Sequence, residues 1–384
     1  MDFSLTTEQQ ALQESARKLA EARFAPTAFT RDGFPWENAK ILADYGFTGI
    51  TIPVEDGGQG GTLMDAVLVM EAISQVCPTS GDAVQATNFG GIRQLAAFGS
   101  DRVKEEVLPK LLAGEGLISA GMSEPEAGSA LTQLTTTAEY DGDEVVINGQ
   151  KIWGSHAPEL THSVVWCRFG PRTRDIGCVV VPTDAPGFRK GPAETYMSGE
   201  HHGALYMDDC RVPREFVLED SDALRKMFTI FGVERVGNAV RALALAQSAF
   251  DRAVEHAKSR EQFGRPLCEF QGLQWKFADM RMKLDAARLL IYRAVSNADD
   301  GAPDPGEASI AKCFTNEIAF EVANDALQVF GAMGYSTEYP LEYFVRRTRG
   351  WMIAGGSVEM MRNRIAEDIF GRRFSQRLPK PESP

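Results

Sequence analysis

Residues 116–218 interrupt a chain whose remaining length is patterned for helices. Short runs rich in β-branched and aromatic residues alternate here with turn signals such as Asn148-Gly149 and Pro186-Gly187. The predicted strands are Thr135–Tyr140, Glu144–Ile147, Ser163–Arg168, Cys178–Val181 and Ala204–Met207. Because no helix-length segment separates these runs, the pattern predicts an antiparallel sheet or barrel and disfavours a βαβ fold. No Gly-x-Gly-x-x-Gly follows a strand, so a Rossmann nucleotide site is not supported.

The segment before this stretch, from Leu5 to about Ala113, has helical spacing. Thr6-Thr7-Glu8-Gln9 offers a capping box, with Leu5 placed as the staple residue before it. Further helices are predicted at Leu63–Ile73 and Arg102–Leu112. The N-terminal part is therefore predicted to be helical.

Longer helices are predicted after about Ala223. An apolar stripe with alternating spacings of three and four residues indicates bundle packing. It is formed by Leu273, Phe277, Met280, Leu284, Ala287 and Ile291. Residues 300–306 contain two prolines and two glycines and predict a loop, after which a second long helix is expected from about Glu307 to Phe330.

At 384 residues the chain is too long for one ordinary core. We predict an α+β protein with an N-terminal helical domain (1–115), a middle antiparallel β domain (116–220) and a C-terminal four-helix bundle (221–384).

Composition excludes several classes of function. The net charge of −13 disfavours binding to nucleic acid or to an anionic membrane as the main activity. No apolar run is long enough to span a bilayer, and the N-terminus lacks the pattern of a secretory signal. The six cysteines form no Cys-x-x-Cys pair and predict buried thiols in a reducing compartment. We expect a cytoplasmic protein.

Five motifs in one order resemble the acyl-CoA dehydrogenase family. Residues 122–129 (Met-Ser-Glu-Pro-Glu-Ala-Gly-Ser) are similar to the family signature, and residues 147–153 (Ile-Asn-Gly-Gln-Lys-Ile-Trp) are similar to its Asn-Gly-x-Lys-x-Trp strand. The other three are Asp209–Pro213, Arg260–Gly264 followed by Phe270-Gln271, and Gln328–Tyr335. The resemblance runs from about Phe3 to Phe370. It departs from the family at Glu126, which replaces a usual glycine, and at Ala130, which replaces a usual aspartate.

The resemblance implies FAD as the cofactor, an acyl-CoA substrate, a homotetramer and an electron-transfer flavoprotein as electron acceptor. It places FAD between the middle domain and the bundle, reaching a neighbouring subunit. The family's cofactor contacts on the same chain fall on Met122, Ser123, Ser129, Trp153, Ser155, Ser357 and Glu359. Those that serve the partner's FAD fall on Arg260, Phe263, Gln328, Gly331 and Ala332. Ser129 and Arg235 are expected to contact the CoA substrate.

These residue types suit a flavin, although each has an ordinary alternative. Trp153 offers a stacking face, and Arg260 offers a planar fork that can pair with a diphosphate. By itself, however, Trp153 is typical of a core tryptophan on a strand. Arg93 lies in an otherwise apolar helical stretch, where it could recognise an acidic acyl group, but we interpret it as a surface arginine. His156, His201 and His202 are interpreted as polar surface or turn residues without metal-ligand spacing.

The expected catalytic base is the main departure from the family. In many members a glutamate of a C-terminal loop removes the α-proton, but Gly355 occupies that position here. Other members, such as the isovaleryl and long-chain types, take the base from the first long helix of the bundle, and that position falls on Glu234. We expect Glu234 to be the base and the Gly355 N–H to polarise the thioester carbonyl. The alternative for Glu234 is a first-turn glutamate favoured by the helix dipole.

Three functions are compatible with these residues. The first is an acyl-CoA dehydrogenase. The second is a CoA flavoprotein with other chemistry, such as an enoyl-CoA reductase or a lyase that eliminates a β-substituent. The third is a catalytically silent subunit of a hetero-oligomer.

Overall fold

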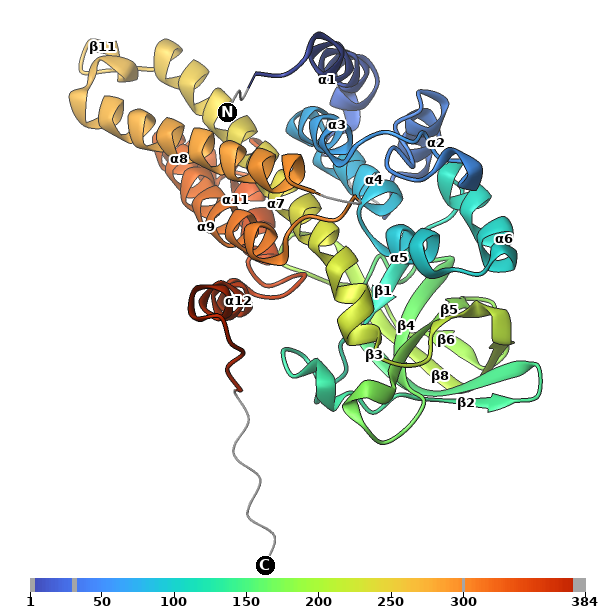
Figure 1. Cartoon of the computed structure of the whole chain (residues 1–384). Coiled ribbons are helices and arrows are strands. Elements are labelled where there is room, and N and C mark those ends of the chain that lie inside the picture. Colours follow the sequence, from blue (N-terminus) through green and yellow to red (C-terminus); the bar gives the residue numbers. More distant parts are fainter. Residues whose placement is uncertain (1–3, 30–32, 299–300, 376–384) are drawn as a thin grey trace, which may run out of the picture.

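The computed structural model describes residues 4–29, 33–298 and 301–375, in the order helices, sheet, helices (Figure 1). The N-terminal helices are α1 (Thr7–Leu19), α2 (Trp36–Asp44), α3 (Leu63–Val76), α4 (Pro78–Asn88), α5 (Gly91–Phe98) and α6 (Asp101–Leu112). The predicted capping box is confirmed at the start of α1, where Thr6 Oγ1 accepts from the Gln9 N–H at 3.2 Å and Gln9 Oε1 accepts from the Thr6 N–H at 3.0 Å.

The middle part is a nine-stranded sheet in the order β6-β8-β3-β2-β4-β5-β9, with β1 paired to β4 and β7 to β8. Its strands are β1 (Ile118–Gly121), β2 (Thr137–Asp141), β3 (Glu144–Ser155), β4 (His162–Arg168), β5 (Ile176–Pro182), β6 (Phe188–Lys190), β7 (Glu194–Thr195), β8 (His201–Pro213) and β9 (Val217–Glu219). The pairing is mostly antiparallel, as predicted, but β1 runs parallel to β4, and Thr137 of β2 is also paired in parallel with Arg168 of β4. Two predicted strands extend further than expected, because β3 continues to Ser155 and β8 spans His201–Pro213.

The C-terminal part is built on α7 (Ala223–Ser259), α8 (Gln271–Ser296), α9 (Pro305–Phe330) and α11 (Leu341–Trp351). A hairpin of β10 (Glu261–Gln262) and β11 (Arg265–Pro266) joins α7 to α8, and the shorter helices α10 (Ala332–Tyr335) and α12 (Val358–Phe370) follow. The predicted stripe of α8 packs inward, because Met280, Leu284, Ala287 and Ile291 are buried. Helix α9 begins two residues before the predicted start: Pro305 occupies its first turn, and Asp304 accepts hydrogen bonds from the Gly306 and Glu307 N–H groups. Residue 300 of the predicted loop lies outside the described residues.

The three parts share apolar cores. Residues of α1, α3 and α4 lie in one cluster with α7, α8 and α9, and residues of α5 and α6 pack with the sheet and the start of α7. We retain the divisions 1–115, 116–220 and 221–384 as a proposal; they separate α6 from β1 and β9 from α7.

The absence of a membrane-spanning segment and the buried thiols were both expected from the sequence. In the described part of the chain, no helix is both long and apolar enough to cross a bilayer. All six cysteines are free, and all are buried except Cys268, which is half-buried. The predicted buried thiols are thus confirmed at five positions.

Candidate active site

Glu234 lies inside α7, about three turns from the helix start at Ala223. The interpretation of Glu234 as a first-turn, dipole-stabilised residue is therefore wrong. Its Oε2 accepts a hydrogen bond of 2.8 Å from Gln85 Nε2 on α4. Although part of the residue is exposed, its carboxyl group lies deep enough that burial raises the pKa of Glu234, while the Arg241 charge, the Gln85 hydrogen bond and the Lys312 charge oppose the rise. A carboxylate with a raised pKa suits a general base.

A glycine on α7 allows Gln85 to approach Glu234. A Cβ at Gly237 would lie 2.2 Å from Gln85 Oε1 and 2.8 Å from the Phe89 ring, so any larger residue would displace Gln85. The contact between α4 and α7 thus depends on the missing side chain at position 237.

Gly355 lies in the loop between α11 and α12, and this loop is fixed against α7 and α9. Its φ of +68° is in the region that favours glycine. A Cβ at Gly355 would lie 3.6 Å from Lys312 Nζ and 3.8 Å from Asn238 Nδ2. Asn238 is one helical turn beyond Glu234 on α7. The structure therefore places the Gly355 loop within about one turn of Glu234.

The signature loop after β1 is held by a buried ion pair. Lys151 Nζ lies 2.7 Å from Glu124 Oε1, and both side chains are almost fully buried. Glu124 also accepts hydrogen bonds from the backbone N–H and hydroxyl groups of Thr135 and Thr136. Burial alone would raise the pKa of Glu124, but Lys151 and these hydrogen bonds lower it to about 2. The pair fixes the loop that carries Met122, Ser123 and the exposed Ser129.

Trp153 projects from an irregular point of β3. The register between β3 and β8 shifts between Lys151 and Gly154, and Trp153 has a φ of +63°. Its side chain is 56% exposed, so the alternative of a core tryptophan is wrong. Ser155, two residues later, is also exposed. An exposed indole held by strained backbone is typical of a ligand-binding position, because bulges re-aim side chains toward sites.

The predicted partner-facing residues gather at the opposite end of the bundle. The hairpin with β11 projects beyond α7 and α8, far from the sheet (Figure 1). Phe263 at its tip has a φ of +52° and is 95% exposed. His256 of α7 stacks on Phe330 of α9 with ring centroids 4.1 Å apart, so the ends of these two helices lie together. Arg260, Phe263, Gln328, Gly331 and Ala332 are all exposed there.

These residues lie at the far end of α7 from Glu234. From Glu234 to Ser259, α7 covers about 38 Å at about 1.5 Å per residue. The structure therefore divides the predicted cofactor contacts into two sets at opposite ends of the bundle.

The remaining predicted residues lie near α12 and α7. Ser357 is the N-cap of α12 and accepts from the Met360 N–H at 3.4 Å. The exposed Glu359 follows in the first turn, and the Ser357 hydroxyl and nearby backbone lower its pKa. Arg235 is 9% exposed, with its guanidinium 6.0 Å from the Phe228 ring and 5.8 Å from the Phe231 ring. Burial, together with the Arg364 charge, lowers the pKa of Arg235 to about 10, so its guanidinium is still charged at neutral pH.

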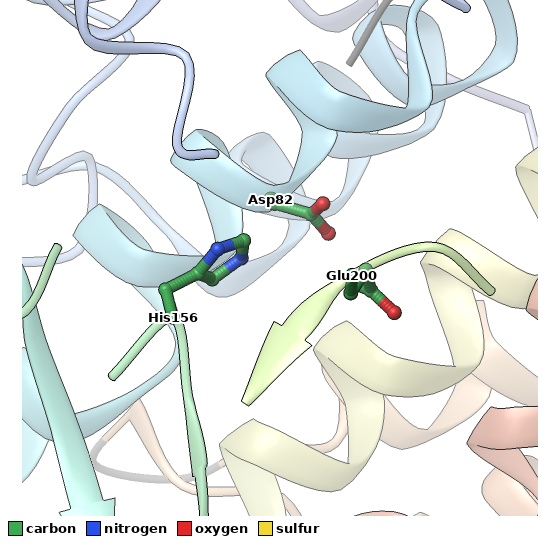
Figure 2. A group of neighbouring side chains, drawn as sticks. All are labelled: Asp82, His156 and Glu200. Carbon is green, nitrogen blue, oxygen red and sulfur yellow. The ribbon is translucent and has the colours of Figure 1, made fainter. Parts of the chain in front are cut away.

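Sequence reasoning missed a charged cluster beside Gln85. Asp82 of α4, His156 after β3 and Glu200 before β8 have polar atoms within 4.8 Å of one another (Figure 2). Arg241 Nη1 donates to Asp82 at 2.8 Å, and Arg347 forms ion pairs with both Asp82 and Glu200. Burial alone would raise the pKa of Asp82, but Arg347 and Arg241 hold it below its ordinary value. Because two guanidinium groups neutralise both carboxylates, we interpret the cluster as an ion-pair network and not as a metal centre.

The signal for this cluster in the sequence is weak. Asp82 is the one charged residue in Pro78–Asn88, a helix of otherwise small, polar and apolar residues, but its partners come from segments far along the chain. His156 takes part in the cluster and His202 is half-buried, with its ring stacked 4.0 Å from that of Tyr196. His156 does lie in a turn, as expected, although it takes part in the cluster; the expectation of a surface or turn histidine is wrong for His202, which lies half-buried in β8.

A cavity of about 790 Å³ has no residue of the Glu234 site among its lining residues. Thr51 of the N-terminal part and Tyr292 of α8 are among its lining residues. Arg93, also in its wall, donates to the Thr51 carbonyl at 2.5 Å and to the Gly301 carbonyl at 3.2 Å. Arg93 is half-buried and bonded to two backbone carbonyls, so its interpretation as a surface arginine is wrong. None of the predicted catalytic or cofactor-binding residues lines this cavity. We therefore base the candidate active site on the residues around Glu234.

Comparison with known proteins gives matches along nearly the whole chain. Three families match in chain order: acyl-CoA dehydrogenase N-terminal domain over residues 6–115, middle domain over 119–210 and C-terminal domain over 224–370. A 3-sulfinopropanoyl-CoA desulfinase of Paraburkholderia xenovorans is 38% identical over 98% of this chain and 99% of its own length. A probable acyl-CoA dehydrogenase of Mycobacterium tuberculosis is 35% identical over 94% of this chain and 95% of its own.

Solved structures show the same fold over nearly the whole chain. A glutaryl-coenzyme A dehydrogenase in complex with glutaryl-CoA superposes with a TM-score of 0.93 at 30% identity, covering 97% of this chain and 98% of that one. Butyryl-CoA dehydrogenase from Megasphaera elsdenii superposes with a TM-score of 0.91 at 30% identity, covering 96% and 100%. Helices, sheet and bundle follow one another in the predicted order, and the chain belongs to the acyl-CoA dehydrogenase family.

Proposed function

We propose that this protein is an FAD-dependent dehydrogenase that converts an acyl-CoA thioester to the trans-2-enoyl-CoA, with Glu234 as the base. The observation that carries the proposal is the position of Glu234: a carboxylate with a pKa raised by burial, within about one helical turn of the Gly355 loop. Position 355 itself offers no carboxylate.

The residues at the edge of the sheet fit a flavin. An exposed indole at Trp153, a hydroxyl at Ser155 and the fixed loop with Ser123 and Ser129 offer a stacking face and hydrogen-bonding groups. Met122 lies in the same loop. Ser357 and Glu359 at the start of α12 are the remaining same-chain contacts that we propose. When bound, FAD would accept the β-hydrogen with its electron pair.

The chain's own groups perform the rest of the reaction. Glu234 takes the proton from the α-carbon, and the electrons of that bond form the new double bond as the β-hydrogen leaves. The Gly355 N–H donates to the thioester oxygen and stabilises the negative charge that develops there. Ser129 and Arg235 would contact the CoA portion; for Arg235 this requires its buried guanidinium to reach the ligand.

The two sets of cofactor contacts support self-association. Arg260, Phe263, Gln328, Gly331 and Ala332 would complete the FAD site of a neighbouring copy, since they lie too far from their own. Exposed Trp275, Met282 and Leu289 recur every seven residues on α8, and such a row of large apolar side chains is typical of an interface. A homotetramer, or at minimum a dimer, follows from the proposal.

We propose an electron-transfer flavoprotein as the electron acceptor. A structure described as the electron transferring flavoprotein of Acidaminococcus fermentans includes a chain that superposes with a TM-score of 0.91 at 33% identity, covering 96% of this chain and 99% of its own length, which supports this choice.

A β-elimination lyase is the second candidate. Relatives that are 36–38% identical over at least 97% of this chain are named 3-sulfinopropanoyl-CoA desulfinase, an activity on a short acyl group with a charged substituent. The charged cluster beside Gln85, with Arg241 and Arg347, is compatible with a short, polar acyl group and unfavourable for a long aliphatic one. Nothing in the site specifically favours an enoyl-CoA reductase or a silent subunit.

An anaerobic panel of acyl-CoAs distinguishes these functions. The purified protein with FAD is mixed with butyryl-, glutaryl- and 3-sulfinopropanoyl-CoA while flavin absorbance and thioester products are followed. Dehydrogenation predicts bleaching of the flavin and formation of an enoyl-CoA. Release of the sulfur group without net flavin reduction would instead favour the lyase, and a colourless protein that takes up no added FAD would overturn both.

A further inference from the structure

Lys312 of α9 is fully buried, yet no carboxylate pairs with it in the described part of the chain. Its Nζ donates instead to the Ala354 carbonyl at 2.5 Å and to the Gly356 carbonyl. These two carbonyls flank Gly355. Lysine is rarely buried without a charged partner, because taking its ammonium group out of water is costly. The buried Lys312 ammonium group therefore costs free energy of folding that no ion pair among the described residues offsets.

The Ala354 carbonyl and the Gly355 N–H belong to one planar peptide unit. In a trans peptide the two groups point in opposite directions, and the described part of the chain contains no cis peptide bond. A donor on the carbonyl side therefore directs the N–H away from Lys312. The N–H groups of Ile353 and Ala354 donate to the Gly350 carbonyl of α11, whereas that of Gly355 donates to no described residue.

A neutral contact already holds the end of α11, from which this loop starts. Asn316, one turn after Lys312 on α9, donates to the Trp351 carbonyl at 2.6 Å and to Asn238 Oδ1 at 2.7 Å. Mere attachment of the loop therefore does not require a cation. What a cation adds is polarisation: a charged donor on a carbonyl strengthens the N–H of the same amide as a donor, and more so in a site with a low dielectric.

We propose that Lys312 is a positioning residue that orients and polarises the 354–355 peptide, so that the Gly355 N–H stabilises negative charge on the thioester oxygen. The inference rests on the proposed function, because it takes the thioester to bind at Gly355. Lys312 touches neither substrate nor base; it acts through the peptide unit.

The electrostatics around Lys312 are consistent with this role. Burial, together with the Arg235 charge, lowers the pKa of Lys312 to about 7, while Glu234 works in the opposite direction. The ammonium form is therefore available at neutral pH. The same charge is the smallest of the influences that oppose the rise in the pKa of Glu234, so the main effect of Lys312 is on the 354–355 peptide.

The test uses the FAD-loaded protein with crotonyl-CoA labelled with ¹³C at the carbonyl, and vibrational spectroscopy of the bound thioester. A strong donor lowers the C=O stretching frequency relative to free ligand. Lys312→Gln retains a neutral donor for the loop carbonyls but removes the charge. Lys312→Met removes both, and Lys283→Met is a control that removes a half-buried lysine of α8 whose partner is Glu321 of α9.

We expect Lys312→Gln to bind crotonyl-CoA and FAD as the wild type does, while losing most of the carbonyl shift. Its kcat should fall about tenfold to hundredfold with little change in KM, less than the hundred- to thousandfold that follows loss of a whole oxyanion donor. Lys312→Arg, which keeps the charge, should recover part of the shift, and Lys283→Met should behave as wild type.

A wild-type carbonyl shift in Lys312→Gln would overturn the proposal, and so would a lost shift accompanied by loss of FAD. If Lys312→Met does not fold, the carbonyl shift measured in Lys312→Gln still tests the proposal. The spectroscopic result is also independent of turnover. If no acyl-CoA bleaches the wild-type flavin, the dehydrogenase function fails, yet the shift of bound crotonyl-CoA still reports on Lys312.

Discussion

Replacing Glu234 by glutamine should separate catalysis from stability. Glutamine keeps the shape of the side chain and can still accept from Gln85 Nε2, the contact that holds Glu234 at 2.8 Å. It cannot accept the α-proton. General-base loss costs about a hundred- to ten-thousandfold in rate, which corresponds to about 2.7–5.5 kcal/mol in the barrier. We expect flavin reduction to fall within that range, while FAD content and acyl-CoA binding stay near wild type.

The same substitution should stabilise the fold at neutral pH. Burial raises the pKa of Glu234 above its ordinary value of 4.5, so the folded protein favours the protonated form. That stabilisation is complete below the unfolded pKa and is lost as pH rises through the folded pKa. Glutamine carries no charge at any pH, so the Glu234→Gln variant does not lose this stabilisation as pH rises. Its melting temperature should exceed that of wild type at neutral pH, and the difference should shrink as pH falls toward 4.5.

Rapid mixing with the best acyl-CoA of the panel measures the rate, and calorimetry at several pH values measures the stability. Glu255→Gln is the matched control, because Glu255 lies on the same helix and is exposed. Undiminished bleaching in Glu234→Gln would refute the assignment of the base. A slow variant that has also lost FAD or unfolds more easily would refute the reasoning about its environment.

Three further outcomes are expected. Gln85→Leu removes a hydrogen bond that lowers the pKa of Glu234, so the acid limb of the kcat/KM profile should move to higher pH. Lys151→Met leaves the Glu124 carboxylate buried and unpaired, which should reduce the free energy of unfolding by about 3–5 kcal/mol in denaturant titrations. Arg260→Ala removes a charged partner for the diphosphate and should lower the FAD-to-protein ratio in absorbance spectra, without altering the secondary structure seen by circular dichroism.

The sequence predicted the fold well because its signals are local. Capping residues, strand runs and the stripe on α8 each act within a few residues, and the structure confirms the elements they predict. Element ends were less certain: β3 and β8 are longer than predicted because their pairing through Gly149–Ser155 depends on the partner strand. The parallel pairing of β1 with β4 has no local signal at all.

The candidate site was predicted only where a motif marks it. Glu234, Gly355 and Trp153 entered through resemblance to a family, whereas Gln85 and Lys312 were missed. Their importance arises from contacts between α4 and α7 and between α9 and the Gly355 loop, at separations of 149 and 42 residues. A lysine in an apolar helix was the available signal for Lys312, but only the structure shows which carbonyls it meets.

Helix α7 carries the proposed base, Glu234, near one end, and Arg260 lies just beyond the other, about 38 Å away. If each active site combines Glu234 of one chain with Arg260 of its partner, mixed assemblies should show complementation. Pairing a Glu234→Gln chain with an Arg260→Ala chain leaves one site with both residues intact and one with neither. Each variant alone has only impaired sites. Refolding the two variants together should therefore restore activity above that of either homo-oligomer. If Arg260 served its own chain's flavin, no mixed site would be intact, and activity in the mixture would stay at the average of the two variants.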